Sequence, residues 1–156
     1  MVAGIGLTAA LLVACAAGTS RGSQAMTEHP FETILAAANS GISERRREVI
    51  RDEASWARLW AEIHTGLTPA PPLPAVDFTR QMLIAVALGT RPSGGFAVKV
   101  RSVATRGDKL EVSVAESCPG AGAMVTMSLT SPVEVVRLPR LTQPPTFQET
   151  RAAACR

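Results

Sequence analysis

Residues 82–115 read MLIAVALGTRPSGGFAVKVRSVATRGDKLEVSVA and decide the fold class. The run at 82–88 is apolar at every position and has the length of a strand, so it predicts a central strand buried on both faces. The stretches 96–104 and 109–115 alternate apolar and polar residues, which is typical of strands with one buried face. Because turn-forming residues join them at 106–108, they predict an antiparallel hairpin.

Residues 53–65 change from this alternation to a helical spacing. Large apolar side chains recur there at i, i+3, i+4 and i+7, which places them on one stripe of a helix. They are Trp56, Leu59, Trp60 and Ile63. Asp52 is a suitable N-cap and Gly66 a suitable stop, so the segment predicts an amphipathic helix whose tryptophans pack into a core. The next segment, 66–77, contains four prolines and is expected to run extended over the surface.

Shorter stretches on both sides predict further strands. Residues 31–52 suggest two strands joined into a hairpin by the turn-forming residues at 39–41. Two more strands are expected at 124–129 and 132–138, before the prolines of 139–145 end regular structure. The sum is an α+β, mainly antiparallel β domain. We expect a small sandwich or barrel-like sheet of about six to seven strands with one amphipathic helix packed on it.

The amino-terminal region is similar to the leader of an exported protein. Residues 1–14 are apolar, uncharged and shorter than the roughly 20 residues of a membrane-spanning helix, so they predict a signal peptide. The sequence LVAC at 12–15 resembles a bacterial lipobox, in which the cysteine carries lipid. Residues 15–30 then predict a flexible tether and 31–156 a single domain. The alternative is a buried amino-terminal helix, because no Lys or Arg precedes Cys15.

Lipid at Cys15 would hold the chain at a membrane of the cell envelope, facing the periplasm or the cell surface, where disulfides persist. Cys118 and Cys155 then remain as an even pair and are expected to bond to each other. Two free thiols are the alternative. The histidines and cysteines lack metal-binding spacing, so neither a metal nor another cofactor is expected.

Composition and charge argue against several kinds of partner. Sixteen Lys and Arg residues against thirteen Asp and Glu residues give a net charge of +3, which is too small to indicate nucleic-acid binding. Basic residues cluster only at 45–47, which we interpret as a solvated edge or, alternatively, a contact for acidic lipid or an acidic partner. No phosphate-binding loop is present, and neither His29 nor His64 lies in a nucleophile motif, so no catalysis and no small-molecule substrate are expected.

Five motifs follow one another along the chain: EASWARLW at 53–60, VDF at 76–78, LGTRPSGGF at 88–96, PGAGAMV at 119–125 and SPVEVVRLPR at 131–140. Their order resembles that of the protease complex subunit PrcB family, and the resemblance covers roughly residues 33–147. It implies an exported or lipid-anchored accessory protein that binds another protein and has no catalytic residues of its own.

Two loops carry the candidate partner-binding residues, because Gly and Pro concentrate there between regular strands. The residues are Arg91, Pro92, Ser93, Gly94, Gly95, Phe96, Pro119, Gly120 and Gly122. Family members commonly have Tyr at the position of Phe96 and Thr at that of Ser93, so this chain lacks the ring hydroxyl. The loop at 91–96 is either a strand connector or a contact surface. It is also similar to the glycine and aromatic turn of chagasin-like inhibitors of cysteine peptidases.

The leading hypothesis is an accessory subunit that binds or stabilises an exported protease. A protease inhibitor is the first alternative, and a structural envelope lipoprotein without a protease partner is the second. An inhibitor would gather rigid loops at one end of the domain. A subunit would instead present a broad face able to bury about 1,600 Å².

Overall fold

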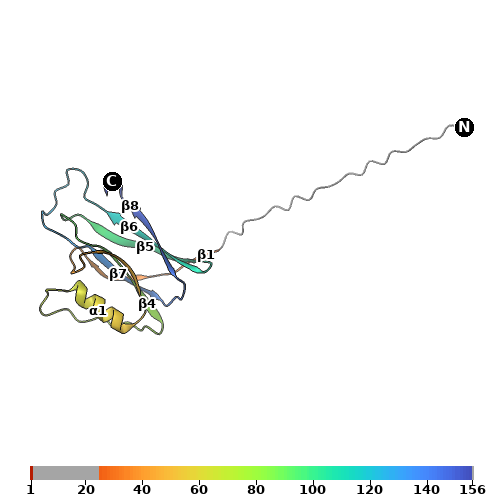
Figure 1. Cartoon of the computed structure of the whole chain (residues 1–156), viewed down its shortest axis with the longest axis horizontal. Helices are drawn as coiled ribbons and strands as arrows, with labels where there is room; N and C mark the ends of the chain where they lie inside the picture. Colours follow the sequence, from red (N-terminus) through yellow and green to blue (C-terminus); the bar gives the residue numbers. More distant parts are fainter. Residues whose placement is uncertain (2–24, 156) are drawn as a thin grey trace.

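The computed structural model describes residue 1 and residues 25–155 (Figure 1). This part of the chain forms strands β1 (Met26–Glu28), β2 (Glu32–Ala37), β3 (Arg45–Ile50), β4 (Gln81–Leu88), β5 (Ala97–Arg106), β6 (Lys109–Ser117), β7 (Val133–Pro139) and β8 (Pro145–Arg151). Its helices are α1 (Glu53–Ile63) and the short 3₁₀ helix η1 (Ala153–Cys155). The predicted signal peptide, apart from Met1, and the predicted lipidation residue Cys15 lie outside the described residues.

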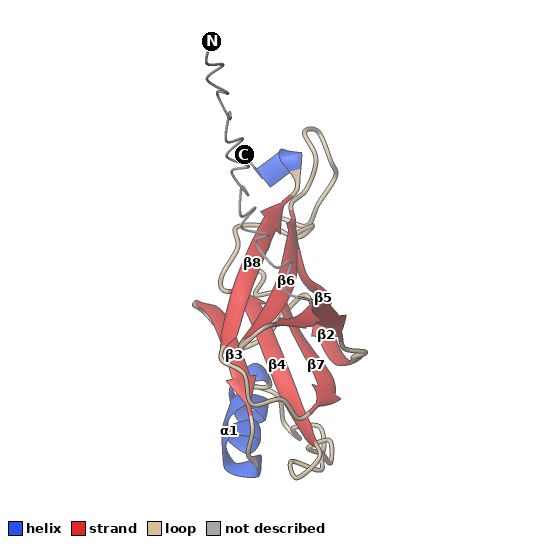
Figure 2. Ribbon diagram, turned by 90° about the vertical axis from the view of Figure 1, so that its right-hand side faces the viewer, coloured by secondary structure: helices blue, strands red, loops and turns tan. Residues whose placement is uncertain are grey.

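The strands form two four-stranded sheets that pack face to face (Figure 2). Sheet A has the order β1-β5-β6-β8, and sheet B has the order β2-β7-β4-β3. Neighbouring strands are antiparallel except β6 and β8, which are parallel. α1 covers the outer face of sheet B (Figure 1). This arrangement confirms the predicted mainly antiparallel sandwich with one packed helix, with eight described strands where six to seven were expected.

β4 shows why the apolar run at 82–88 decides the fold. Its even-numbered side chains, from Met82 to Leu88, belong to the core between the two sheets. Its odd-numbered side chains at 83, 85 and 87 pack on the other face, beneath α1. All seven are almost completely buried, so β4 lies in the middle layer of the molecule, as predicted.

α1 begins after the predicted cap Asp52 and ends at Ile63, two residues before the predicted end. The carboxylate of Asp52 accepts a hydrogen bond from the backbone N–H of Ser55 at 2.8 Å, which satisfies a free donor of the first turn. Gly66 follows the helix with a φ of 85°, a conformation that glycine adopts without strain. On the predicted stripe the buried side chains are Trp56, Leu59 and Ile63. The helix therefore packs on sheet B through the face that its sequence specifies.

The proline-rich segment 66–77 forms no strand, as predicted, and it covers α1. The indole N–H of Trp56 donates to the carbonyl oxygen of Pro74 at 2.9 Å, and that of Trp60 donates to Pro71 at 3.0 Å. Prolines cannot donate a backbone hydrogen bond but can accept one, so the segment suits this role. The two tryptophans thus act as part of the core and hold the segment in place.

β5 and β6 form the predicted hairpin, with Arg106 paired to Lys109 at the turn. A bulge interrupts the pairing between Val100 and Ser102. There the carboxylate of Glu134, a buried residue of β7, accepts a hydrogen bond of 2.6 Å from the backbone N–H of Val100. The contact joins the two sheets at the point where the ladder of sheet A is irregular.

The predicted hairpin at 31–52 is wrong. β2 and β3 form, but they lie at opposite edges of sheet B, with β7 and β4 between them. The connecting segment 38–44 runs past the end of α1, where the N–H of Gly41 donates to the carbonyl oxygen of Ile63 at 2.9 Å. A Cβ atom on Gly41 would lie 2.1 Å from the carbonyl oxygen of Glu62. The glycine is therefore required by a close approach to the helix and not by a tight turn.

Two other predictions about the strands are also wrong. Residues 124–129 form no strand and belong to a loop. The prolines of 139–145 do not end regular structure, because β8 begins at Pro145 and pairs in parallel with β6. Proline is tolerated at the first residue of an edge strand, where its missing N–H removes little from the ladder.

The predicted tether at 15–30 is too long at its carboxyl-terminal end. Residues 26–28 form β1, which pairs with the last residues of β5 and places Met26 opposite Arg106. The N–H of His29 continues this ladder by donating to Val103 at 2.8 Å. The folded domain therefore includes β1, and residues 15–24 of the predicted tether lie outside the described residues.

Candidate functional site

Two loops meet at one end of the sandwich, which we call the loop end. The short loop (89–96) joins β4 to β5, and the long loop (118–132) joins β6 to β7. The backbones of Arg91 and Thr130 exchange hydrogen bonds of 2.7 and 3.0 Å, and the Thr130 hydroxyl donates to the carbonyl oxygen of Ser93 at 2.7 Å. The structure therefore brings the two predicted contact segments together.

The glycine pair of the short loop lies against the long loop. The N–H of Gly94 donates to the carbonyl oxygen of Thr126 at 2.9 Å, and a Cβ atom on Gly94 would lie 2.5 Å from the Thr126 hydroxyl oxygen. Gly95 has a φ of 84°, and a Cβ there would lie 3.0 Å from Pro119 and Val125. Both glycines therefore serve the contact between the loops, and their backbone is the part that approaches closely.

A disulfide joins Cys118 to Cys155, as predicted, with the two Cα atoms 5.3 Å apart. Cys118 is the first residue of the long loop, and Cys155 is the last residue of η1. The bond therefore fixes the carboxyl-terminal segment to the base of the long loop. Beside it lies a cavity of about 200 Å³ that is lined in part by Arg91, Phe96 and Arg151.

The other predicted contact residues differ in how accessible they are. The guanidinium carbon of Arg91 lies 5.9 Å from the centre of the Phe96 ring, so these two partly buried side chains contact each other. Pro92, Gly120 and Gly122 are exposed. A Cβ atom at Gly120 or Gly122 would meet no other atom within 4 Å, so this part of the long loop is open to a partner.

The sequence prediction missed the most exposed apolar residues of the loop end. Met124 is 101% exposed, Met127 is 90% exposed and Leu129 is 71% exposed. All three lie in the segment 124–129, for which the sequence predicts a strand. The signal that argues for a loop is the flanking sequence, since PGAGA precedes this segment and TSP follows it. Neighbouring exposed apolar side chains on a loop are typical of an interaction surface.

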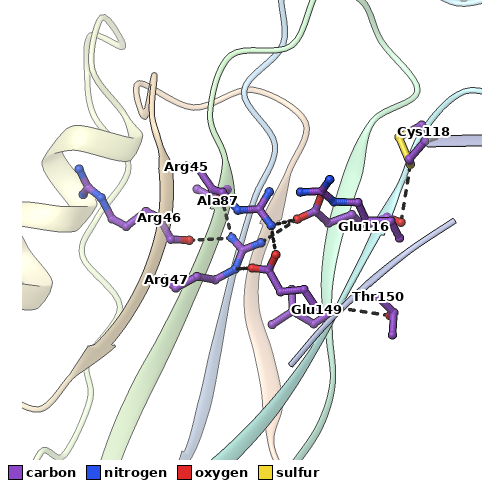
Figure 3. A network of polar contacts seen from close by, with 11 residues as sticks. Arg45, Arg46, Arg47, Ala87, Glu116, Cys118, Glu149 and Thr150 are labelled. Carbon is purple, nitrogen blue, oxygen red and sulfur yellow. Dashed lines mark hydrogen bonds and ion pairs between the residues drawn. A yellow bond between two sulfur atoms is a disulfide. The ribbon is translucent and has the colours of Figure 1, made fainter. Parts of the chain in front are cut away.

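A network of charged side chains lies at the edge where β3 of sheet B meets β6 and β8 of sheet A (Figure 3). Arg45 pairs with both Glu116 and Glu149. Arg47 contacts the same two carboxylates, at 3.0 Å from Glu116 and 2.9 Å from Glu149. Arg151 approaches the second oxygen of Glu116 at 3.4 Å. The network therefore links the two sheets.

The arginine triplet at 45–47 is thus not simply a solvated edge. The Arg46 side chain points away from the network, toward α1 (Figure 3). It forms two hydrogen bonds of 2.6 and 2.7 Å with the carboxylate of Glu62. Arg47 is mostly buried and also donates to the carbonyl oxygen of Ala87 at 2.8 Å. All three arginines therefore have acidic partners within the chain.

The charges of this network shift the pKa values of its members. Burial raises the pKa of the Glu116 carboxyl, but the hydrogen bond from Arg45 and the positive charges of Arg45, Arg151 and Arg47 outweigh it and leave the pKa below its usual value. The hydrogen bond with Glu116 raises the pKa of Arg45. Burial, followed by repulsion from Arg45, lowers the pKa of Arg47. Glu116 is therefore held ionised by its neighbours.

The two histidines have separate local contacts. The Nε2 atom of His29 lies 3.1 Å from the hydroxyl oxygen of Thr105, and the Nδ1 atom of His64 lies 2.9 Å from the carbonyl oxygen of Trp60.

Within residues 25–155, no group of three or more His, Cys, Asp or Glu side chains is arranged to hold a metal ion. No helix in this part of the chain has the length and apolar character needed to cross a membrane.

Comparison with known proteins identifies a family that part of the chain resembles. Residues 82–139 match the family model described as PrcB C-terminal. This segment runs from β4 to β7 and contains both loops of the loop end. No curated protein and no solved structure matches the chain. The match lies within the stretch over which the order of the motifs resembles the same family, so the segment from β4 to β7 is similar to a PrcB C-terminal domain.

Proposed function

We propose that this chain is an accessory subunit that binds an exported protease through its loop end. The observation that carries the proposal is the trio Met124, Met127 and Leu129, which stand in solvent on a loop whose base is held by a disulfide. Such a loop loses little conformational freedom on binding, so burial of its apolar side chains contributes more fully to affinity. The family name supports a protease complex as the setting.

The test replaces Met124, Met127 and Leu129 together with Ser. Affinity for the partner should fall by roughly 30-fold or more, since apolar anchors at the centre of an interface contribute about 2 kcal/mol or more. The free energy of unfolding should change by no more than about 0.5 kcal/mol, because the three side chains are exposed. The measurement is purification of the tagged chain from intact envelopes, followed by identification and quantification of co-purifying proteases.

The matched control is Leu67→Ser, which removes another exposed apolar side chain far along the sequence from the loop end. This control should retain the protease. Equal recovery of a protease with the triple variant and the unchanged chain would exclude the loop end as the contact. Absence of any protease from the unchanged sample would exclude the proposed function itself.

One observation favours protease inhibition as a second function. Two loops that are fixed to each other gather at one end of the sandwich, which is the arrangement that an inhibitor inserting loops into a cleft requires. An activity assay of the protease, purified together with this chain, distinguishes the two functions. A subunit would leave the activity of the protease intact or raise it, whereas an inhibitor would abolish hydrolysis of small peptide substrates at stoichiometric amounts.

We propose further that lipid on Cys15 anchors the chain in the cell envelope. The LVAC sequence at 12–15 supports this assignment, because its branched and small residues suit cleavage before the cysteine. Cys15→Ser should therefore move the protein from the membrane fraction to the soluble fraction, as shown by immunoblotting of fractionated cells. Ser23→Ala, in the predicted tether, is the control and should stay with the membrane. Retention of the Cys15→Ser protein in the membrane fraction would refute the anchor.

A further inference from the structure

The cavity beside the disulfide lies between the two sheets at the loop end. The strand register places Arg151 of β8 beside Glu116 of β6. Glu116 lies on the same face of β6 as the residues that this strand contributes to the core between the sheets. Leu88, the last residue of β4, lines the cavity from the other sheet. We call this cavity of about 200 Å³ the mouth cavity.

Two arginines line the mouth cavity, and both have donors to spare. Within residues 25–155, Arg91 forms no ion pair, and Arg151 pairs only with Glu116, at 3.4 Å. The guanidinium carbon of Arg91 lies 5.9 Å from the centre of the Phe96 ring, and the Arg151 side chain is 58% exposed. Each guanidinium group carries five N–H donors, so both can bind a further anion that enters from solvent.

The charges around the mouth cavity do not balance. The network beside it contains three arginines and two carboxylates, and Arg91 adds a fourth cation from the short loop. Burial, followed by repulsion from Arg45, lowers the pKa of Arg47, so the cations already disfavour one another. Among the described residues of this site, positive charge therefore exceeds negative charge by two, which attracts anions.

The size and lining of the mouth cavity restrict which anion suits it. Its volume of about 200 Å³ is below the range of about 300–1,000 Å³ that is typical of pockets for small organic ligands, so it suits a single side chain. Leu88 and Phe96 offer apolar contact to methylene groups. Guanidinium groups bind a planar carboxylate through paired hydrogen bonds. An Asp or Glu side chain combines these properties.

We propose that the mouth cavity receives the carboxylate of one Asp or Glu side chain of the partner protein, which Arg91 and Arg151 bind. This inference rests on the proposed function, because it names the chemistry that the same partner presents. Cys118 lines the cavity and is the first residue of the long loop, so the cavity lies at the base of the loop that carries the three exposed apolar side chains. A partner that covers the loop end would thus present an acidic residue together with apolar ones.

The first test titrates N-acetylglutamate amide into the isotope-labelled full chain at low salt, with binding followed by nuclear magnetic resonance, which detects weak complexes. The largest shifts should appear at the backbone amides of Arg91 and Phe96 and at the side-chain N–H of Arg151. N-acetylglutamine amide has nearly the same shape without the charge and should leave these signals in place. Added salt should weaken binding of the glutamate probe.

Variants of the full chain assign the binding to the two arginines. The cavity variant carries Arg91→Gln and Arg151→Gln and should bind N-acetylglutamate amide about tenfold more weakly, as the loss of two exposed ion pairs implies. The matched control removes the same charge elsewhere through Arg58→Gln and Arg80→Gln. It should bind the probe like the unchanged chain.

Three results would overturn the inference. The first is the absence of shifts around the mouth cavity with N-acetylglutamate amide, and binding of inorganic phosphate in its place would assign the cavity to a phosphate group. The second is equal binding of the glutamate and glutamine probes. The third is equal weakening in the cavity variant and the control variant.

The inference and the proposed function can fail separately. The variant with Ser at Met124, Met127 and Leu129 should still bind the glutamate probe. Binding of this probe without any co-purifying protease would refute the proposed function and leave the carboxylate site. A protease that co-purifies equally with the cavity variant and the unchanged chain would refute the mouth cavity as the partner's site and leave the function.

Discussion

Replacement of both Cys118 and Cys155 with Ser is expected to lower the free energy of unfolding by about 4 kcal/mol. The disulfide closes a loop across a sequence separation of 37 residues, and this cross-link restricts the unfolded chain more than the folded one. The loss should be large for a domain of this size, because total stabilities are about 5–15 kcal/mol. Both cysteines are changed together so that no free thiol remains at the loop end.

Denaturant unfolding of the double variant and of the unchanged chain, with and without a reductant, measures this effect. The reductant should destabilise the unchanged chain to the level of the double variant and should leave the double variant unaffected. Peptide mapping of the unreduced protein should recover the segments around Cys118 and Cys155 as one linked species. Equal unfolding midpoints for all samples would show that the bond does not stabilise the fold.

Glu116→Gln is expected to cost about 3 kcal/mol at neutral pH, because it leaves the mostly buried Arg47, together with Arg45, without the buried carboxylate that they share. The cost should depend on pH. In the unfolded chain the pKa of the Glu116 carboxyl is about 4.3, whereas in the folded protein this pKa is lower. The stabilisation is therefore complete above the unfolded pKa and is lost as the pH falls through the folded pKa.

Unfolding free energies of the variant and the unchanged chain, compared from neutral pH down to acid, test this prediction. The difference should be largest near neutrality and should shrink below about pH 4 as Glu116 becomes protonated. Glu111→Gln is the control, because Glu111 contacts only the half-exposed Arg106 at 3.4 Å. It should cost less than about 1 kcal/mol. A Glu116→Gln difference that stays constant into acid would contradict the role assigned to its charge.

The sequence predicts those elements whose signals are local. The spacing from Trp56 to Ile63, with Asp52 as cap, specifies α1, and the alternation through β5 and β6 specifies their hairpin. The all-apolar run of β4 predicts burial on both faces, which the helix and sheet A provide. In each case the residues that decide the structure lie within one or two adjacent segments.

The elements that sequence reasoning missed depend on distant contacts. Gly41 looks like a turn residue, but it is required by its approach to the end of α1. β8 is specified by its parallel pairing with β6, and a proline at its first residue conceals it. Met127 and Leu129 show a strand-like alternation, yet no described strand pairs with them.

The candidate site was predicted only in part. The concentration of Gly and Pro located both loops, and the even pair of cysteines identified the disulfide. The two loops lie side by side because of the order of the strands. The connections from β4 to β5 and from β6 to β7 both pass between the two sheets at the same end of the sandwich. The charge network could not be predicted either, since Arg47 and Glu116 are far apart in sequence and meet only at the sheet edge.

The direction of β1 determines how the domain would stand on a membrane. Met26 lies opposite Arg106, at the hairpin turn, whereas the loop end lies at the other end of β5. β5 has ten residues, so the chain joins the domain about 30 Å from the loop end. With the proposed anchor at Cys15, the tether would join the domain at the end opposite to the loops. A bound protease would then be separated from the point of attachment by the length of the sandwich.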